Sequence, residues 1–136
     1  MKIIGFNLLK VSIERKEKLE GELKIDQNID IKDVVKEKVP ISTKEALRVK
    51  FGFVINYSNN SAKVEFEGFL ILLPEDNEMK EFLDAWKDKQ IYEKAKMPLF
   101  NFIMTKCNVK ALSLEDDLSL PIHLPMPRLN PENTKN

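Results

Sequence analysis

The segment from Leu118 to Leu129 constrains this chain more than any other, because it is strongly apolar and contains three prolines. Proline cannot donate a backbone hydrogen bond and fixes its own φ, so the segment can be neither a helix nor a central strand. We predict that it runs as extended chain. Such a segment needs an apolar surface to lie against, in its own subunit or in a partner, and this favours binding over chemistry.

Chain length and net charge limit the number of domains and the kinds of partner. A chain of 136 residues forms one domain, which we assign to residues 1–130, with residues 131–136 as a polar tail. The 22 basic and 22 acidic residues cancel, so no long-range field attracts nucleic acid or an anionic membrane. We expect a partner that is neither.

The single cysteine and the apolar runs indicate the compartment. Cys107 is the only cysteine, which excludes an intrachain disulfide and suits a reducing cytoplasm. The first residues lack the pattern of a signal peptide, and no apolar run approaches the roughly 20 residues of a membrane span. We therefore expect a cytoplasmic protein without membrane insertion.

Alternation of apolar and polar residues predicts four strands, over Leu9–Ile13, Leu23–Ile31, Leu47–Tyr57 and Val64–Leu72. We predict that the first two form a hairpin. Residues 33–44 then make a crossover to a second hairpin, whose turn at residues 58–61 tolerates positive φ. From Phe69 on, both sides of the fourth strand are apolar, which predicts cover on both faces; another subunit is one possible cover.

Two helices follow the strands. Met79, Phe82, Leu83 and Trp86 recur at i, i+3, i+4 and i+7, which predicts a short amphipathic helix. After a break at residues 89–96, Pro98 is placed in the first turn of a longer helix that ends near Leu114. The predicted fold class is α+β: a four-stranded antiparallel sheet, Greek-key-like, of two hairpins with a crossover, followed by two helices packed on one side.

No set of residues predicts catalysis. His123 is the only histidine, so a two-histidine metal site is excluded, and Asp116 and Asp117 beside it form at best a loose cluster. Cys107 falls on the apolar helix face, which predicts a buried structural cysteine rather than a nucleophile. None of the four glycines lies in a phosphate-binding pattern. We predict no metal, no cofactor and no enzyme activity.

Two apolar sets allow more than one interpretation. The stripe of Phe51, Phe53 and Tyr57 is either core or a ligand platform, and a small sheet needs one filled face, so core is favoured. The helix set from Met79 to Trp86 is either helix-to-sheet packing or a subunit contact. The sequence does not decide between these two.

The order of elements resembles the SecB-like export chaperones over residues 7–129. The local likeness lies in segment 97–100 (Met-Pro-Leu-Phe), similar to that family's proline-opened second helix, and in segment 118–121 (Leu-Ser-Leu-Pro), similar to its exit. The resemblance implies a cytoplasmic homotetramer, a dimer of dimers, that serves protein transport. Such a chaperone holds unfolded protein clients in apolar grooves without ATP.

The resemblance also implies site residues. The short helix would match the oligomer interface, through Met79, Phe82, Leu83 and Trp86. The client-binding groove would be lined by the crossover, the third strand and the tail, with Val34, Val35, Val39, Ile41, Phe51, Phe53, Ile122, Leu124 and Met126.

The chain departs from that family in its charge. The export chaperones are strongly acidic, whereas this chain is neutral, and residues 130–136 show no likeness to the tail that engages the export motor. The departures suit an alternative: a dedicated adaptor or scaffold of the same fold that binds one specific partner or assembly, such as an antitoxin or the ribosome.

Overall fold

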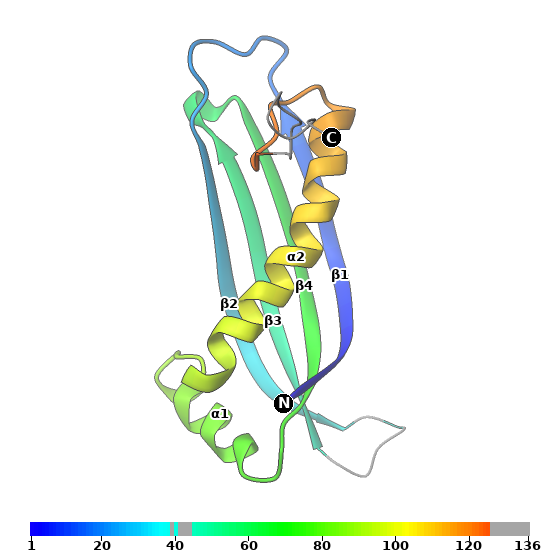
Figure 1. Ribbon diagram of the computed structural model, residues 1–136, viewed down its shortest axis with the longest axis vertical. Coiled ribbons are helices and arrows are strands. Elements are labelled where there is room, and N and C mark those ends of the chain that lie inside the picture. The colour runs from blue at the N-terminus through cyan, green and yellow to red at the C-terminus, as the bar shows by residue number, and fades with distance from the viewer. Residues whose placement is uncertain (39, 41–44, 126–136) are drawn as a thin grey trace, which may run out of the picture.

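The structure is a computed structural model that describes residues 1–38, 40 and 45–125. The elements, in chain order, are β1 (Lys2–Arg15), β2 (Ile25–Lys38), β3 (Glu45–Tyr57), the short 3-10 helix η1 (Ser58–Asn60), β4 (Ala62–Leu73), α1 (Glu78–Lys87) and α2 (Glu93–Asp117). Figure 1 shows α2 running diagonally across one face of the sheet, with α1 at the end of the sheet where β1 begins.

The four strands form one antiparallel sheet in the order β1-β4-β3-β2. Strands β2, β3 and β4 follow one another as neighbours, and β1 joins beside β4, which is a Greek-key arrangement. The predicted fold class, an α+β fold with a four-stranded antiparallel sheet followed by two helices, is confirmed.

The predicted pairing of the first two strands is wrong. β1 and β2 lie at opposite edges of the sheet, so the connection that crosses between edges is segment 16–24 and not segment 33–44. β2 continues to Lys38, and a register shift lies between Ile31 and Asp33. The broken alternation at Asp33 therefore marks a β-bulge within the strand rather than its end.

The inner face of the sheet holds the core. Alternate residues of β3 and β4 meet there, and the rings of Phe53 and Phe66 stack with centroids 5.6 Å apart. Phe51 stacks on Phe6 of β1 at the same distance. Phe51, Phe53 and Tyr57 are all buried, which confirms the interpretation of this stripe as core.

The turn at residues 58–61 contains two positive-φ residues, as the sequence predicts. Asn59 has φ of 60° and Asn60 has φ of 53°. Asparagine tolerates this left-handed conformation better than most residues, so the turn joins β3 to β4 at little cost.

α1 forms where the apolar periodicity predicts it, but α2 begins earlier than predicted. It starts at Glu93, so Pro98 lies inside the helix and the break between the helices shrinks to residues 88–92. The missing N–H of Pro98 deprives only the carbonyl of Lys94 of a partner. Both residues lie on the exposed side, where water can bond that carbonyl.

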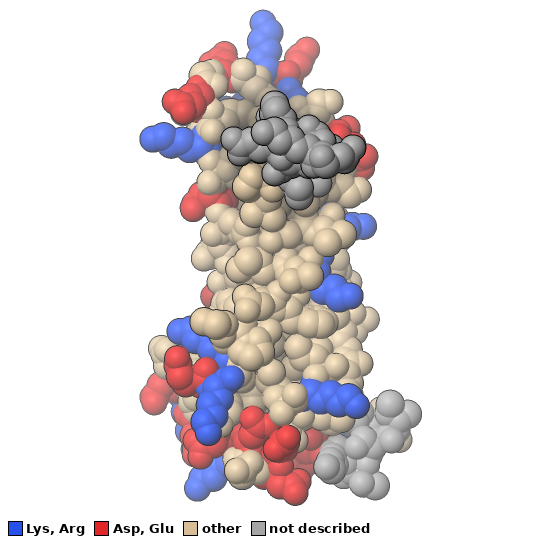
Figure 2. Space-filling view, in the orientation of Figure 1, with Lys and Arg blue, Asp and Glu red and all other residues tan. Residues whose placement is uncertain are grey.

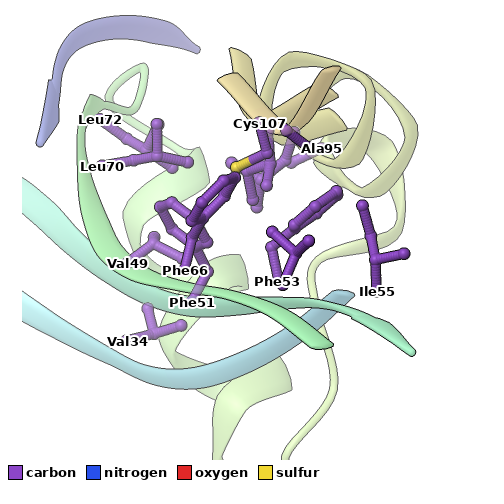
Figure 3. Close-up of a cluster of buried hydrophobic side chains, with 14 of the residues drawn as sticks. Val34, Val49, Phe51, Phe53, Ile55, Phe66, Leu70, Leu72, Ala95 and Cys107 are labelled. Carbon is purple, nitrogen blue, oxygen red and sulfur yellow. The ribbon is translucent and has the colours of Figure 1, made fainter. Parts of the chain in front are cut away.

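The buried side of α2 is a row with a spacing of four residues. It consists of Ala95, Leu99, Ile103, Cys107, Ala111 and Glu115. Four residues turn a helix about 40° past a full turn, so the row winds by about 200° from end to end. This winding lets one helix follow a twisted sheet; Figure 3 shows Ala95 and Cys107 facing the aromatic rings of β3 and β4.

Candidate functional site

A buried polar cluster lies where α2 ends. The carboxylate of Glu115 is 0% exposed and accepts hydrogen bonds from the hydroxyl of Tyr57 at 3.0 Å and from the backbone N–H of His123 at 3.0 Å. The Nδ1 atom of His123 contacts the same carboxylate, and its Nε2 atom lies 2.8 Å from Oδ1 of Asn108. The cluster joins α2, β3 and the proline-rich segment.

The environment of Tyr57 keeps its proton in place. Burial raises the pKa of its hydroxyl well above the usual range, and the adjacent charge and hydrogen bond of Glu115 raise that pKa further. Tyr57 therefore remains a donor, with the Glu115 carboxylate and the Pro121 carbonyl as acceptors in reach.

The cluster does not include Cys107, so His123 and Cys107 do not form a base and nucleophile pair. Both ring nitrogens of His123 are engaged elsewhere. Burial raises the pKa of the Cys107 thiol to about 12, which makes it a structural cysteine, as predicted. Among the described residues, no three His, Cys, Asp or Glu side chains gather as a metal site would require.

Sequence reasoning missed Glu115, because an acidic residue near a helix end is usually solvated. The feature that could have identified Glu115 is its spacing of four and eight residues from Ala111 and Cys107. All members of this four-residue row are buried in the structure. A carboxylate on a buried row needs a partner, and the only histidine follows eight residues later.

Arg15, the last residue of β1, also contacts the end of α2. Its guanidinium donates to the carbonyls of Leu118 at 2.9 Å and Ser119 at 3.2 Å, and also to those of Lys16 and Glu17. A positive charge beside the last carbonyls of α2 also complements the helix dipole. The end of β1, the crossing segment and the end of α2 are thereby fixed together.

We expect Arg15→Ala to lower the free energy of unfolding by about 1–2 kcal/mol, since several charge-assisted hydrogen bonds are lost at a half-exposed site. Arg15→Lys is expected to recover less than half of this loss, because an ammonium group cannot reach several carbonyls at once. Urea denaturation measures both. A loss no larger than that of Lys18→Ala, at an exposed position nearby, would contradict this role.

The outer face of the sheet carries ion pairs around Glu65 and Glu67 of β4. Glu65 lies 2.7 Å from Nζ of Lys10 and 3.0 Å from Nζ of Lys63, and these hydrogen bonds lower the pKa of Glu65 to about 2. Lys32, the bulge residue of β2, extends across Gly52 to Glu67, 2.8 Å away. This part of the outer face presents ion pairs to a partner rather than apolar side chains.

The face that carries α2 is different. Figure 2 shows that acidic and basic side chains gather toward its two ends, while its middle is largely uncharged. Met97 is 73% exposed and Val109 is 68% exposed on α2, and Met104 is also exposed. Met97 and Phe100 border a shallow depression of about 390 Å³, which is also lined by Glu93, Lys96 and Asn101. Exposed apolar side chains on a largely uncharged surface are typical of protein-binding surfaces.

The residues of the predicted client-binding groove fall in different places. Val34, Phe51 and Phe53 are buried in the core, Val35 is exposed on the outer face, and Val39, Ile41 and Met126 lie outside the described residues. Ile122 is exposed and Leu124 half-buried in the proline-rich segment. Tyr57 contacts the proline-rich segment at Pro121, and the partner of Val34 on β3 is eight residues away from Tyr57. Eight residues span about 27 Å along a strand. The members of this set that the structure describes are thus divided between the core, the outer face and the proline-rich segment.

The residues of the predicted oligomer interface all lie on α1. Phe82 is buried, and its ring packs against Tyr92 with centroids 5.2 Å apart. Met79, Leu83 and Trp86 are half-buried against the core, and Nζ of Lys89 lies 4.8 Å from the Trp86 ring. Packing within the chain thus buries Phe82 completely and leaves Met79, Leu83 and Trp86 partly exposed to solvent.

No helix in the described part of the chain combines the length and hydropathy needed to cross a bilayer.

Comparison with known proteins finds a likeness of fold but none of sequence. No protein-family model matches the sequence, and no curated protein is detectably similar to it. The fold is similar to that of the Mycobacterium tuberculosis SecB-like chaperone Rv1957, solved in complex with a ChAD peptide from the HigA1 antitoxin. The TM-score is 0.56 and the identity 19%, over 96% of this chain and 91% of that one. The resemblance to the SecB-like chaperones is thus confirmed as one of fold.

Proposed function

We propose that the protein is an ATP-independent molecular chaperone of the cytoplasm that holds non-native polypeptides on exposed apolar surfaces. The observation that carries this proposal is the α2 face, which is largely uncharged in its middle and has Met97, Met104 and Val109 exposed. A fold shared with a SecB-like chaperone bound to a peptide supports it. Methionine suits such a role, because its flexible side chain adapts to varied client shapes.

The residues predicted to line the client-binding groove divide into exposed residues and buried residues. Ile122, Leu124 and Val35 are able to contact a client, whereas Val34, Phe51 and Phe53 support the surface from the core. An extended client spans the distance between such separate contacts better than a folded one. The chain's neutral charge favours holding clients without coupling to an export motor.

We further propose that the protein works as a homo-oligomer, a tetramer built as a dimer of dimers. α1 contributes to the interface through Met79, Leu83 and Trp86, which are only partly covered by their own chain. Large, partly exposed aromatic and methionine side chains are enriched at such interfaces.

The second candidate is an adaptor dedicated to one protein partner. The solved relative in fold carries a peptide from a single antitoxin, which favours this reading of a peptide-binding surface. An adaptor is expected to bind one sequence tightly and to leave unrelated unfolded chains alone, whereas a holdase captures many.

The α2 surface is tested with Met97→Lys combined with Val109→Lys. We expect the double variant to lose about tenfold or more of its affinity for a reduced, unfolded client, because two exposed apolar contacts are replaced by charges. Its unfolding free energy is expected to change by no more than about 0.5 kcal/mol per site. Fluorescence anisotropy of the labelled client measures the affinity.

The matched control is Lys110→Ala, an exposed charged position next to Val109. It is expected to bind the client as the unchanged protein does. Light scattering on the double variant shows whether these residues hold subunits together instead. A client affinity unchanged by the double substitution would remove the α2 surface from the proposal.

A further inference from the structure

We propose that residues 126–129 of the proline-rich segment (Met-Pro-Arg-Leu) dock on α2 of their own chain, where they occupy the exposed apolar surface as an intramolecular ligand. Their docking site is a stripe along α2 that consists of Met97, Asn101, Met104 and Asn108. The first part of the segment already lies against α2 and Tyr57 in the structure, whereas residues 126–129 follow the last described residue, Pro125.

The described part of the segment turns back along α2. Ser119 has φ of 54°, and the N–H of Leu120 donates to the carbonyl of Glu115 at 2.8 Å, which caps the helix and reverses the chain. His123 then donates its backbone N–H to the carboxylate of Glu115, and its Nε2 atom lies 2.8 Å from Oδ1 of Asn108. Asn108 precedes the end of α2 at Asp117 by nine residues, or about 14 Å. The segment therefore runs from the end of α2 toward its beginning.

The stripe continues α2 beyond the contact with His123. Positions 97, 101, 104, 108 and 115 are separated by four, three, four and seven residues, so their side chains lie on one side of the helix. Exposure rises along this line: Glu115 is 0% exposed, Met104 is 38% exposed and Met97 is 73% exposed. The stripe is thus covered where the described segment contacts it and open toward the beginning of α2.

The sequence of the segment matches this surface at every third residue. Proline-rich chain favours the polyproline II conformation, in which three residues make one turn and every third residue shares a side. Leu120 is 6% exposed and the His123 side chain is 1% exposed, while Pro121 and Ile122 between them are exposed. Met126 and Leu129 are the next two members of this series. The side that contacts α2 therefore continues with two apolar residues.

The distances allow both residues to contact the stripe. Met104 precedes Asn108 by about 6 Å along the helix axis and Met97 precedes it by about 16 Å. At about 3.1 Å per residue, the six residues from His123 to Leu129 span up to about 19 Å. Met126 thus reaches Met104, and Leu129 reaches the depression bordered by Met97. Prolines stiffen the connecting chain, so docking costs little conformational entropy.

Docking of residues 126–129 has a consequence for clients. A client has to displace them from Met97 and Met104, so its apparent affinity falls in proportion to the fraction of molecules with a free surface. This consequence rests on the proposed function. The docking itself does not, because it is measured without any client.

The test is the initial rate of methionine oxidation by dilute hydrogen peroxide in the full chain, followed by mass spectrometry of its peptides. Oxidation is faster at exposed methionines, so Met97 and Met104 report whether the stripe is covered. The test variant combines Met126→Asp with Leu129→Asp. We expect it to oxidise Met97 and Met104 about threefold or more faster than the unchanged protein. Met79 of α1 is the internal reference and is expected to keep its rate.

The matched control combines Asn133→Asp with Thr134→Asp, which adds the same charge beyond Leu129 and is expected to leave all rates unchanged. A reciprocal variant, Met97→Lys with Met104→Lys, is expected to oxidise Met126 about threefold or more faster. It decides alone if faster oxidation of Met79 reveals a folding defect in the test variant.

Equal rates in the unchanged protein and the test variant would overturn the docking, as would an equal increase in the matched control. Protection of Met97 that disappears on dilution would also overturn it, because the occupant would then be a second copy of the chain. Failure to bind clients would change none of these rates, so it is distinguishable from failure of the docking.

Discussion

Gly68→Ala is expected to detach β1 from the sheet and to lower the free energy of unfolding by about 3 kcal/mol or more. A Cβ atom at position 68 would lie 2.3 Å from the backbone oxygen of Asn7 and 3.1 Å from Cα of Leu8. Both obstacles belong to the backbone of the neighbouring strand, so no side-chain rotation relieves the overlap. β1 is an edge strand, and moving away is its easiest response.

The matched control is Gly5→Ala in the same pair of strands. Its Cβ would meet the Ile71 side chain at 3.4 Å, an ordinary contact, so we expect a change of no more than about 1 kcal/mol. Urea denaturation gives both free energies, and hydrogen exchange shows whether β1 amides lose protection first. Equal effects of the two substitutions would mean that the close approach of β1 to Gly68 is not a feature of the protein.

Phe53→Ala is expected to lower the free energy of unfolding by about 3–5 kcal/mol, enough to unfold a marginally stable domain. Its ring is fully buried and stacks on Phe66 with an interplanar angle of 11°, so truncation leaves a cavity in the centre of the core. Val35→Ala, at an exposed position on the outer face, is the control and is expected to change stability by no more than about 0.5 kcal/mol.

This substitution also separates two roles for the aromatic stripe. If Phe53 lined a client-binding groove, its removal would weaken client binding while leaving the fold intact. We expect the reverse order: loss of stability first, and loss of binding only as the fold is lost. Thermal unfolding followed alongside client anisotropy distinguishes the two outcomes.

The elements that the sequence predicts best are those with an uninterrupted period. α1 has apolar residues at i, i+3, i+4 and i+7 and forms where expected, and β3 has an apolar residue at every second position from Leu47 to Tyr57. Alternation identifies which face of a strand is buried, but it carries no information about which strand lies beside it. The pairing of β1 with β4 depends on contacts between residues far apart in sequence and was therefore missed.

Local irregularities account for the remaining errors. Register shifts in β1 and β2 each break the alternation, and the one beyond Ile31 imitated the end of a strand. The buried row of α2 winds around the helix, so its pattern has no single apolar side and concealed Glu115. Pro98 is tolerated inside α2 because it lies on the exposed side of the helix. The sequence alone does not show which side of the helix Pro98 occupies.

The proposed chaperone activity is tested by measuring the solution mass of the protein and its uptake of a client together. Light scattering is carried out on the purified protein alone and with a reduced, unfolded client, while turbidity follows client aggregation. We expect a tetramer that takes up the client and suppresses its aggregation at stoichiometric amounts without ATP. A monomer or dimer that leaves unfolded chains to aggregate would contradict the chaperone proposal and favour an adaptor with a single partner.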